Sequence, residues 1–149
     1  MVFPSWGFLL GGGGGGARFA TAFTGIGLAA DSGLSGSLAQ AVGPSRAAAL
    51  MLLGDRFGAE AAERWGLVHR VVADGTATEE GLALARRLAA GPTAAYGEVK
   101  ELLRTAADAD LPALLEAEAA AQQRLGRTQD HRGAVRAFLE GRAPAFGGN

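Results

Sequence analysis

Apolar residues recur at helical spacing through the second half of this chain. Between 111 and 119 they stand at i, i+3, i+4 and i+8, and Val135, Phe138 and Leu139 repeat the first three of these spacings. Such spacing places apolar side chains on one face of a helix. We therefore predict helices over 79–90, 93–106, 111–127 and from 131 to the break at Gly141.

Capping residues and helix breakers mark where these helices begin and end. Thr78, Asp110 and Asp130 each precede a predicted helix, and their side-chain oxygens are suited to accept hydrogen bonds from first-turn N–H groups. Gly91-Pro92 ends the first of the four helices, because proline cannot continue one. The second half is therefore expected to form one compact helical layer.

The first half has a less regular pattern. We predict a helix over 45–53 between Pro44 and Gly54, and a short helix over 59–65 that Gly66 ends. The β-branched residues in 67–72 predict a short strand that stops at Asp74-Gly75. Residues 17–35 mix short apolar pieces with glycine and serine, which suits a strand end followed by a loop.

Six consecutive glycines, Gly11–Gly16, follow an apolar decapeptide. Glycine loses the most backbone entropy on folding and offers no side chain to pack, so we expect a flexible linker here. A phosphate-binding loop would require Lys and Ser or Thr next, whereas Ala17 and Arg18 follow.

Composition narrows the function classes. The chain has 149 residues, 48% of them hydrophobic, no cysteine and a net charge of -1, which fits one soluble domain without disulfides or thiolate metal sites. The balanced charge excludes a basic footprint for nucleic acid or an anionic membrane surface. No apolar run is long enough for a membrane helix, and the first ten residues lack the positive start of a signal peptide. We expect a cytoplasmic protein with a small organic ligand or a protein partner.

Asp31 is the acidic residue that stands out, because small apolar residues flank it. We therefore expect its carboxylate to be desolvated, which disfavours the charged form and is how such a group becomes a proton shuttle near neutral pH. The alternative is that its carboxylate caps the following turn or helix. His69 and His131 have no partner at metal-ligand spacing, so we expect no metal site.

Four segments in a fixed order resemble the C-terminal half of the enoyl-CoA hydratase/isomerase (crotonase) superfamily, from about Ala17 to Phe146. The segments are ARFATAFTGIGLAADSGLS, VGPSRAAALMLLGDRFGAEAAERWGLVHRVV, LARRLAAGPTAAYGEVKELL and AVRAFLEGRAPAF. The resemblance implies an α/β crotonase-like fold that lacks most of its N-terminal β/α spiral, so we expect a truncated form. The part present should be mainly α-helical with one or two short strands.

The same resemblance divides the chain into three parts. It implies an apolar segment and Gly-rich linker over 1–16, the end of the crotonase-like core with its active-site loop over 17–76, and a C-terminal helical region over 77–149. The last region is similar to the one through which family members trimerise. A homo-oligomer, either a trimer or a dimer of trimers, is therefore expected.

Acyl-CoA chemistry is the activity that the resemblance implies. Residues 27–33 look like the loop of the isomerase and phenylacetate-pathway branch, in which an acidic residue moves a proton, so Asp31 becomes the catalytic candidate. Phe23 stands where hydratases carry a glutamate, and Phe138 matches an aromatic that packs by the CoA adenine. Phe23, Leu28 and Phe138 are the substrate-binding candidates. Coenzyme A enters as part of the substrate, and no other cofactor is expected.

Three functions follow, in this order of preference. The first is an enoyl-CoA isomerase that shifts a double bond through Asp31 and an enolate. The second is a non-catalytic helical fragment that assembles with itself or with full-length relatives. The third is an enoyl-CoA hydratase, which would need a second carboxylate near Asp31, and residues 18–43 contain no other.

Overall fold

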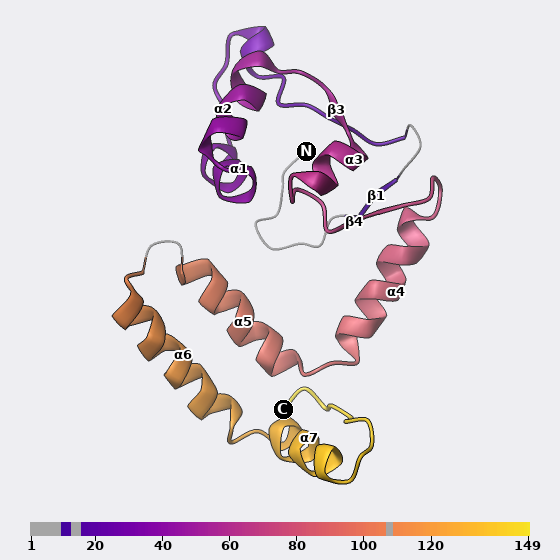
Figure 1. Ribbon diagram of the computed structural model, residues 1–149, viewed down its shortest axis with the longest axis vertical. Coiled ribbons are helices and arrows are strands. Elements are labelled where there is room, and N and C mark those ends of the chain that lie inside the picture. Colours follow the sequence, from indigo (N-terminus) through magenta and orange to yellow (C-terminus); the bar gives the residue numbers. More distant parts are fainter. Residues whose placement is uncertain (1–9, 13–15, 107–108) are drawn as a thin grey trace. The chain divides into compact units, whose positions relative to one another are not determined.

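A computed structural model describes residues 10–12, 16–106 and 109–149 of the chain. These residues are mostly α-helical, with short strands of two or three residues, which confirms the expected mainly helical architecture (Figure 1). The chain divides into two compact units, Met1–Leu82 and Ala83–Asn149. None of the helices in the described ranges is long and apolar enough to cross a membrane.

The first unit consists of short strands and short helices that precede and follow the loop over 20–33. Strand β2 (Arg18–Phe19) pairs antiparallel with β3 (Phe57–Gly58), and β1 (Leu10–Gly12) pairs in parallel with β4 (Arg70–Val72). The helical elements are η1 (Thr24–Ile26), α1 (Leu34–Val42), α2 (Pro44–Leu53) and α3 (Ala59–Arg64).

The glycine run is not a linker throughout. Gly11 and Gly12 lie in β1, where they align with Val71 and Val72 of β4. The expectation of a flexible linker is therefore wrong for these two residues. Glycine keeps both backbone hydrogen-bonding groups, so pairing with an existing strand compensates for its poor intrinsic tendency to form one. Residues 1–9 and 13–15 of the predicted apolar and linker segment lie outside the described residues.

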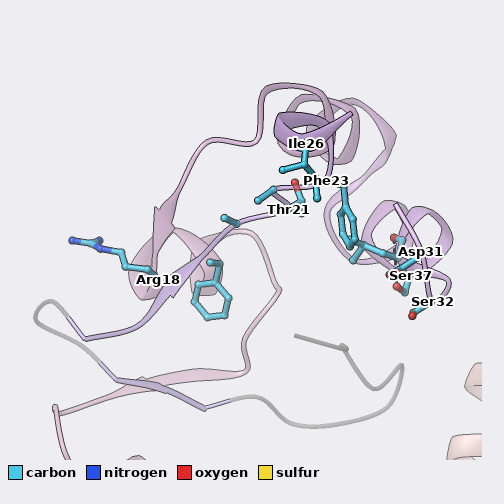
Figure 2. A pocket seen from close by; sticks show the side chains of 11 residues that line it. Arg18, Thr21, Phe23, Ile26, Asp31, Ser32 and Ser37 are labelled. Atoms are coloured by element: carbon cyan, nitrogen blue, oxygen red, sulfur yellow. Dashed lines mark hydrogen bonds between the residues drawn. The ribbon is translucent and has the colours of Figure 1, made fainter. Parts of the chain in front are cut away.

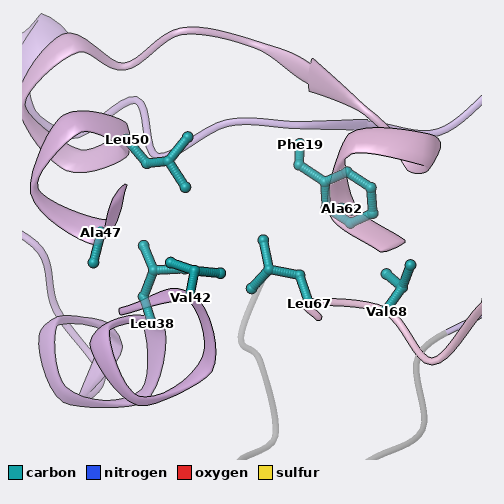
Figure 3. Close-up of a cluster of buried hydrophobic side chains, with 8 residues drawn as sticks. All are labelled: Phe19, Leu38, Val42, Ala47, Leu50, Ala62, Leu67 and Val68. Atoms are coloured by element: carbon teal, nitrogen blue, oxygen red, sulfur yellow. The ribbon is translucent and has the colours of Figure 1, made fainter. Parts of the chain in front are cut away.

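One apolar cluster holds the first unit together (Figure 3). It joins β2, α1, α2, α3 and the segment after α3 through buried Phe19, Leu38, Val42, Ala47, Leu50, Ala62, Leu67 and Val68. Aromatic rings extend it, because Phe57 stacks on Phe19 with centroids 5.4 Å apart and meets Trp65 at 5.0 Å. The cluster thus fixes β2 and α1, the two elements on either side of the 20–33 loop.

Helix α1 is an element that the sequence analysis does not predict, whereas the helix predicted over 45–53 is confirmed as α2. Leu38 and Val42 are the buried residues of α1, and Gly43 ends it with a φ of +80°. Pro44 then begins α2, as the proline-at-start, glycine-at-end asymmetry indicates. The serines and glycine of α1 have weak helix propensity, so tertiary packing of Leu38 and Val42 decides the outcome here.

The loop between β2 and α1 is tied to the C-terminal end of α2. The Thr21 hydroxyl donates to the Leu50 carbonyl at 2.6 Å, and the Thr24 hydroxyl donates to the Met51 carbonyl at 3.1 Å. The last carbonyls of a helix have no partner within it, and the Thr24 hydroxyl satisfies one of these, that of Met51. The Leu50 carbonyl already accepts from the Gly54 N–H at 3.0 Å, and the Thr21 hydroxyl is its second donor. Thr21 is buried, which makes its bond the better protected one.

The second unit is helical. It contains the end of α4 (Ala77–Ala89), followed by α5 (Thr93–Ala106), α6 (Leu111–Leu125) and α7 (Gln129–Leu139). Helices α5 and α6 lie side by side (Figure 1), and the Arg124 guanidinium makes two 2.7 Å bonds to the Glu98 carboxylate between them. The four predicted C-terminal helices are confirmed.

Two of the predicted helix caps are wrong and one is confirmed. The Asp110 carboxylate accepts from the Ala113 N–H at 2.9 Å, as predicted. Thr78, in contrast, lies inside α4, which begins at Ala77. Asp130 also lies inside its helix, because the Thr128 hydroxyl is the cap of α7.

The Asp130 carboxylate binds the end of the chain. It is buried and accepts from the N–H groups of Gly147 at 2.6 Å and Gly148 at 2.9 Å, while its own N–H donates to the Asn149 carbonyl. This arrangement is favoured over a helix cap, because each of the two carboxylate oxygens accepts one N–H group. Asp130 therefore holds residues 147–149 against the start of α7.

We expect Thr21→Val to lower the free energy of unfolding by about 1 kcal/mol, because it removes a buried hydrogen bond and keeps the apolar volume. Urea unfolding followed by tryptophan fluorescence measures this, since both tryptophans precede residue 83. Thr78→Val is the matched control, because Thr78 is exposed on α4. Equal effects of the two substitutions would contradict the role of the Thr21 hydroxyl.

The Glu98–Arg124 pair makes stability depend on pH. The hydrogen bonds from Arg124 hold the pKa of Glu98 below its ordinary value of 4.5, against a smaller opposing effect of desolvation. A lowered folded-state pKa adds stability that is present above 4.5 and is lost as the pH falls through the lower folded-state value.

Glu98→Gln should therefore lower the Tm at neutral pH, and the difference from the unsubstituted chain should shrink as the pH falls below 4.5. The effect should be small because the pair is at the surface. Calorimetry across this pH range measures it, with Glu118→Gln on α6 as the control. A Tm difference that stays constant with pH would rule out the ion pair as its cause.

Candidate functional site

An open hollow of about 520 Å³ lies along the loop that joins β2 to α1 (Figure 2). Its wall is formed by β2, the loop, η1 and the first turn of α1, all within the first unit. The residues that line it are Arg18, Phe19, Ala20, Thr21, Ala22, Phe23, Ile26, Asp31, Ser32, Leu34 and Ser37. Of these, Asp31 is the one acidic residue and Arg18 the one basic residue.

The structure brings two of the four predicted site residues together. Asp31 and Phe23 both line the hollow, and in Figure 2 the Phe23 ring points toward the segment that carries Asp31. Leu28 is 58% exposed and is not among the lining residues. Phe138 belongs to α7 in the second unit, where the residue is 83% exposed.

Asp31 is exposed, so the expected burial of its carboxyl group is wrong for this chain. Its neighbours are small, and Ala29, two residues before it, is itself exposed, so these residues do not cover the carboxylate. The alternative role as a helix cap is also wrong, because Gly33 is the N-terminal cap residue of α1 and no side chain caps that helix.

The Asp31 carboxylate is available to a molecule in the hollow. Within the described ranges, no side chain or backbone N–H donates a hydrogen bond to its oxygens, and its main-chain carbonyl alone is engaged by Leu34. A candidate base needs access to the proton it takes, and an exposed carboxylate on the wall of a hollow meets that requirement. The site can therefore exchange a proton with a bound molecule.

A strained turn follows Asp31 immediately. Ser32 has a φ of +51° and Gly33 a φ of +77°, and the Leu34 N–H donates to the Asp31 carbonyl at 2.9 Å. Positive φ at both central residues defines a type I′ turn. In the described part of the chain, Ser32 is the one non-glycine residue with positive φ, a conformation that costs about 1–3 kcal/mol.

Sequence reasoning missed several lining residues, because it did not predict α1. Leu34 and Ser37 line the hollow from the first turn of that helix, and Ile26, a residue that is 75% exposed, lines it from η1. An exposed isoleucine and a half-buried Phe23 give the wall apolar surface beside the carboxylate. The available signal was the spacing of Leu34, Leu38 and Val42, which is helical.

The described residues do not contain a cluster of three or more His, Asp or Glu side chains that could hold a metal ion. His69 and His131 are both exposed and lie in different units. The polar groups of the hollow are instead one carboxylate, one guanidinium and several hydroxyls. Such a set suits an organic substrate with an apolar part and a mobile proton.

Comparison with known proteins identifies relatives of this chain. The family model described as enoyl-CoA hydratase/isomerase matches residues 14–149. The 1,2-epoxyphenylacetyl-CoA isomerase of Escherichia coli (strain K12) is 39% identical over 132 residues, which are 89% of this chain and 50% of that protein. A Rhodobacter capsulatus protein assigned as an enoyl-CoA hydratase is 42% identical over 132 residues, or 89% of this chain and 51% of the relative.

Solved structures show the same relationship. A Mycobacterium abscessus protein assigned as an enoyl-CoA hydratase/isomerase superposes with a TM-score of 0.87 at 57% identity, covering 89% of this chain and 51% of the other. The chain thus spans about half the length of the relatives it matches. The resemblance drawn from the sequence motifs is confirmed, and since the family match covers residues 14–149, the chain belongs to the enoyl-CoA hydratase/isomerase family.

Proposed function

We propose that this chain carries the acid/base part of an enoyl-CoA isomerase site, in which the Asp31 carboxylate moves a proton and a double bond shifts. The observation that carries the proposal is that, of the residues that the structure describes, Asp31 is the one acidic side chain lining the hollow. Its exposed carboxylate has no donor among the described residues, so it is free to act on a substrate.

The proposed reaction conserves all atoms of the substrate. The Asp31 carboxylate takes a proton from C2 of a 3-enoyl thioester, and the electron pair of that C–H bond moves toward the thioester oxygen to give a dienolate. The Asp31 carboxyl group then returns the proton to C4, which leaves a double bond between C2 and C3. One group that accepts and then donates a proton is sufficient for both steps.

The residues of the wall favour isomerisation over hydration. The resemblance implies that hydratases carry a glutamate at the position of Phe23, and here a half-buried aromatic ring lines the hollow instead. Hydration requires activation of a water molecule as well as protonation of a carbon atom. The lining offers one carboxylate for these tasks, so hydratase activity is the less supported alternative.

The substrate is proposed to be an acyl-CoA, with coenzyme A as part of the substrate and no other cofactor. Phe23 and Ile26 give the acyl group an apolar wall next to the carboxylate. The Phe138 ring, which is exposed on α7, is proposed to pack by the CoA adenine. We also propose that Leu28 contacts the substrate, and the resemblance alone supports this role. The cytoplasm, with its supply of acyl-CoA, is the proposed location.

Self-association is the second candidate function, and the exposed apolar side chains of the second unit favour it. Helices α5 to α7 expose half or more of Val99, Leu103, Leu111, Leu115, Phe138 and Leu139. Exposed apolar surface gains free energy when a partner covers it. We propose a homo-oligomer, either a trimer or a dimer of trimers. If the chain does not convert an acyl-CoA substrate, we propose instead that it is a non-catalytic assembly fragment.

Asp31→Asn should abolish isomerisation while the fold is kept, because the amide has the same shape but cannot accept the proton. The assay is the absorbance of the conjugated 2-enoyl thioester formed from a 3-enoyl-CoA. Asp55→Asn is the matched control, since Asp55 is exposed and does not line the hollow. Turnover that survives Asp31→Asn would refute the role of Asp31, and silence of the folded unsubstituted chain would favour the assembly fragment.

Phe23→Ala should raise KM about tenfold with a smaller change in kcat, because the lost ring removes apolar contact with the bound acyl group in ground state and transition state alike. Steady-state kinetics with 3-enoyl-CoA substrates of increasing chain length measure the effect. Leu52→Ala is the control, because Leu52 is 70% exposed at the end of α2 and does not line the hollow. An unchanged KM would exclude the Phe23 ring from the acyl site.

A further inference from the structure

The Ser32–Gly33 turn determines how Asp31 stands relative to helix α1. Both residues have positive φ, and Gly33 is the cap residue at which α1 begins. The Gly33 carbonyl is held by two groups of Ser37, its N–H at 3.0 Å and its hydroxyl at 3.1 Å. The turn is therefore held at its Asp31 carbonyl by the Leu34 N–H and at its Gly33 carbonyl by Ser37.

A strained conformation persists only where its surroundings enforce it. Ser32 has a side chain that disfavours positive φ, and the described contacts give its hydroxyl no hydrogen bond that would offset the strain. The enforcing contacts are thus the backbone bonds around Gly33. A Cβ added at Gly33 would meet no atom within 4 Å, so a larger residue would fit there. The position therefore requires glycine for its positive φ and not for its small size.

If Ser32 and Gly33 took the right-handed helical conformation, α1 would begin two residues earlier and Asp31 would be its N-cap residue. An N-cap aspartate accepts readily from first-turn N–H groups, and such bonding stabilises the anion and occupies its oxygens. A carboxylate engaged in this way is a poorer base. The left-handed pair instead turns the chain so that Gly33 is the cap residue and the carboxylate stays unengaged on the wall of the hollow.

We propose that Gly33 is a positioning residue, whose left-handed conformation keeps the Asp31 carboxylate out of the cap of α1 and available for proton transfer. This inference rests on the proposed function of Asp31. It assigns to Gly33 no contact with the substrate. Ser37 supports the same turn through the Gly33 carbonyl.

Gly33→Ala tests the proposal, with Gly75→Ala as its matched control. Gly75 has a φ of +80° and, like Gly33, has no atom within 4 Å of an added Cβ, but it lies in the turn after β4. Both substitutions impose the same backbone strain and should lower Tm to a similar extent. Only Gly33→Ala should lower kcat, by about 100-fold, because displacement of a catalytic group by about 1 Å costs that much.

The split between kcat and KM separates positioning from a general loss of structure. KM should stay near that of the unsubstituted chain in Gly33→Ala, because Phe23 and Ile26 keep their places on the wall. Gly33→Asn should recover much of kcat, since asparagine adopts positive φ more readily than alanine. The expected order of kcat is therefore Gly33, then Asn, then Ala.

Asp31→Asn in the same assay distinguishes the two ways to fail. If Asp31→Asn abolishes turnover and Gly33→Ala behaves as Gly75→Ala does, the function of Asp31 stands and the positioning role of Gly33 is overturned. If Asp31→Asn leaves turnover unchanged, the proposed function fails and this inference fails with it. Equal kcat values for Gly33→Ala and Gly33→Asn would also overturn it, because conformation would then not be the cause.

Discussion

The candidate site depends on the hydroxyl groups of Thr21 and Thr24, which donate to the last carbonyls of α2. In the described part of the chain, the loop that carries Phe23 and Asp31 pairs with no strand, so hydrogen bonds outside the β2–β3 ladder hold it in place. The Met51 carbonyl is one of the acceptors that a helix C-terminus leaves open, whereas the Leu50 carbonyl accepts the Thr21 hydroxyl in addition to the Gly54 N–H. The two threonines therefore stabilise both α2 and the loop, and any molecule in the hollow meets a wall supported by the apolar cluster beneath it.

The resemblance and the helical periodicity predicted more of this chain than local propensity did. Helix α5 begins and ends at the predicted residues, because Pro92 and the apolar spacing agree there. Helix α1 could not be predicted from its serines and glycine, since it exists through the burial of Leu38 and Val42 against α2. Gly11 and Gly12 form a strand for a similar reason: the partner that stabilises them, β4, lies far along the sequence.

The candidate site shows the same division between local and distant information. The loop motif around Asp31 singled out that residue, and the structure places it with Phe23 on one wall. Its exposure could not be deduced from its neighbours, because small apolar flanking residues do not bury a side chain unless another segment covers them. Among the described residues the buried carboxylate is instead that of Asp130, whose partners Gly147 and Gly148 lie 17 and 18 residues later. Contacts between residues so far apart in the sequence cannot be deduced from the charge of a residue and its immediate neighbours.

Family membership leaves the reaction open, because relatives of both isomerase and hydratase type match the chain at similar identity. The residues that line the hollow are a better guide to the choice between isomerisation and hydration than overall sequence identity is. A double-bond shift returns the proton that it removes, so one carboxylate completes the cycle, whereas addition of water divides its work between two groups. Among the described residues the wall holds one carboxylate, and it is also lined by the ring of Phe23, which the resemblance aligns with the hydratase glutamate. The number of proton-transfer groups in the hollow, more than the ancestry of the fold, is therefore the argument for isomerisation.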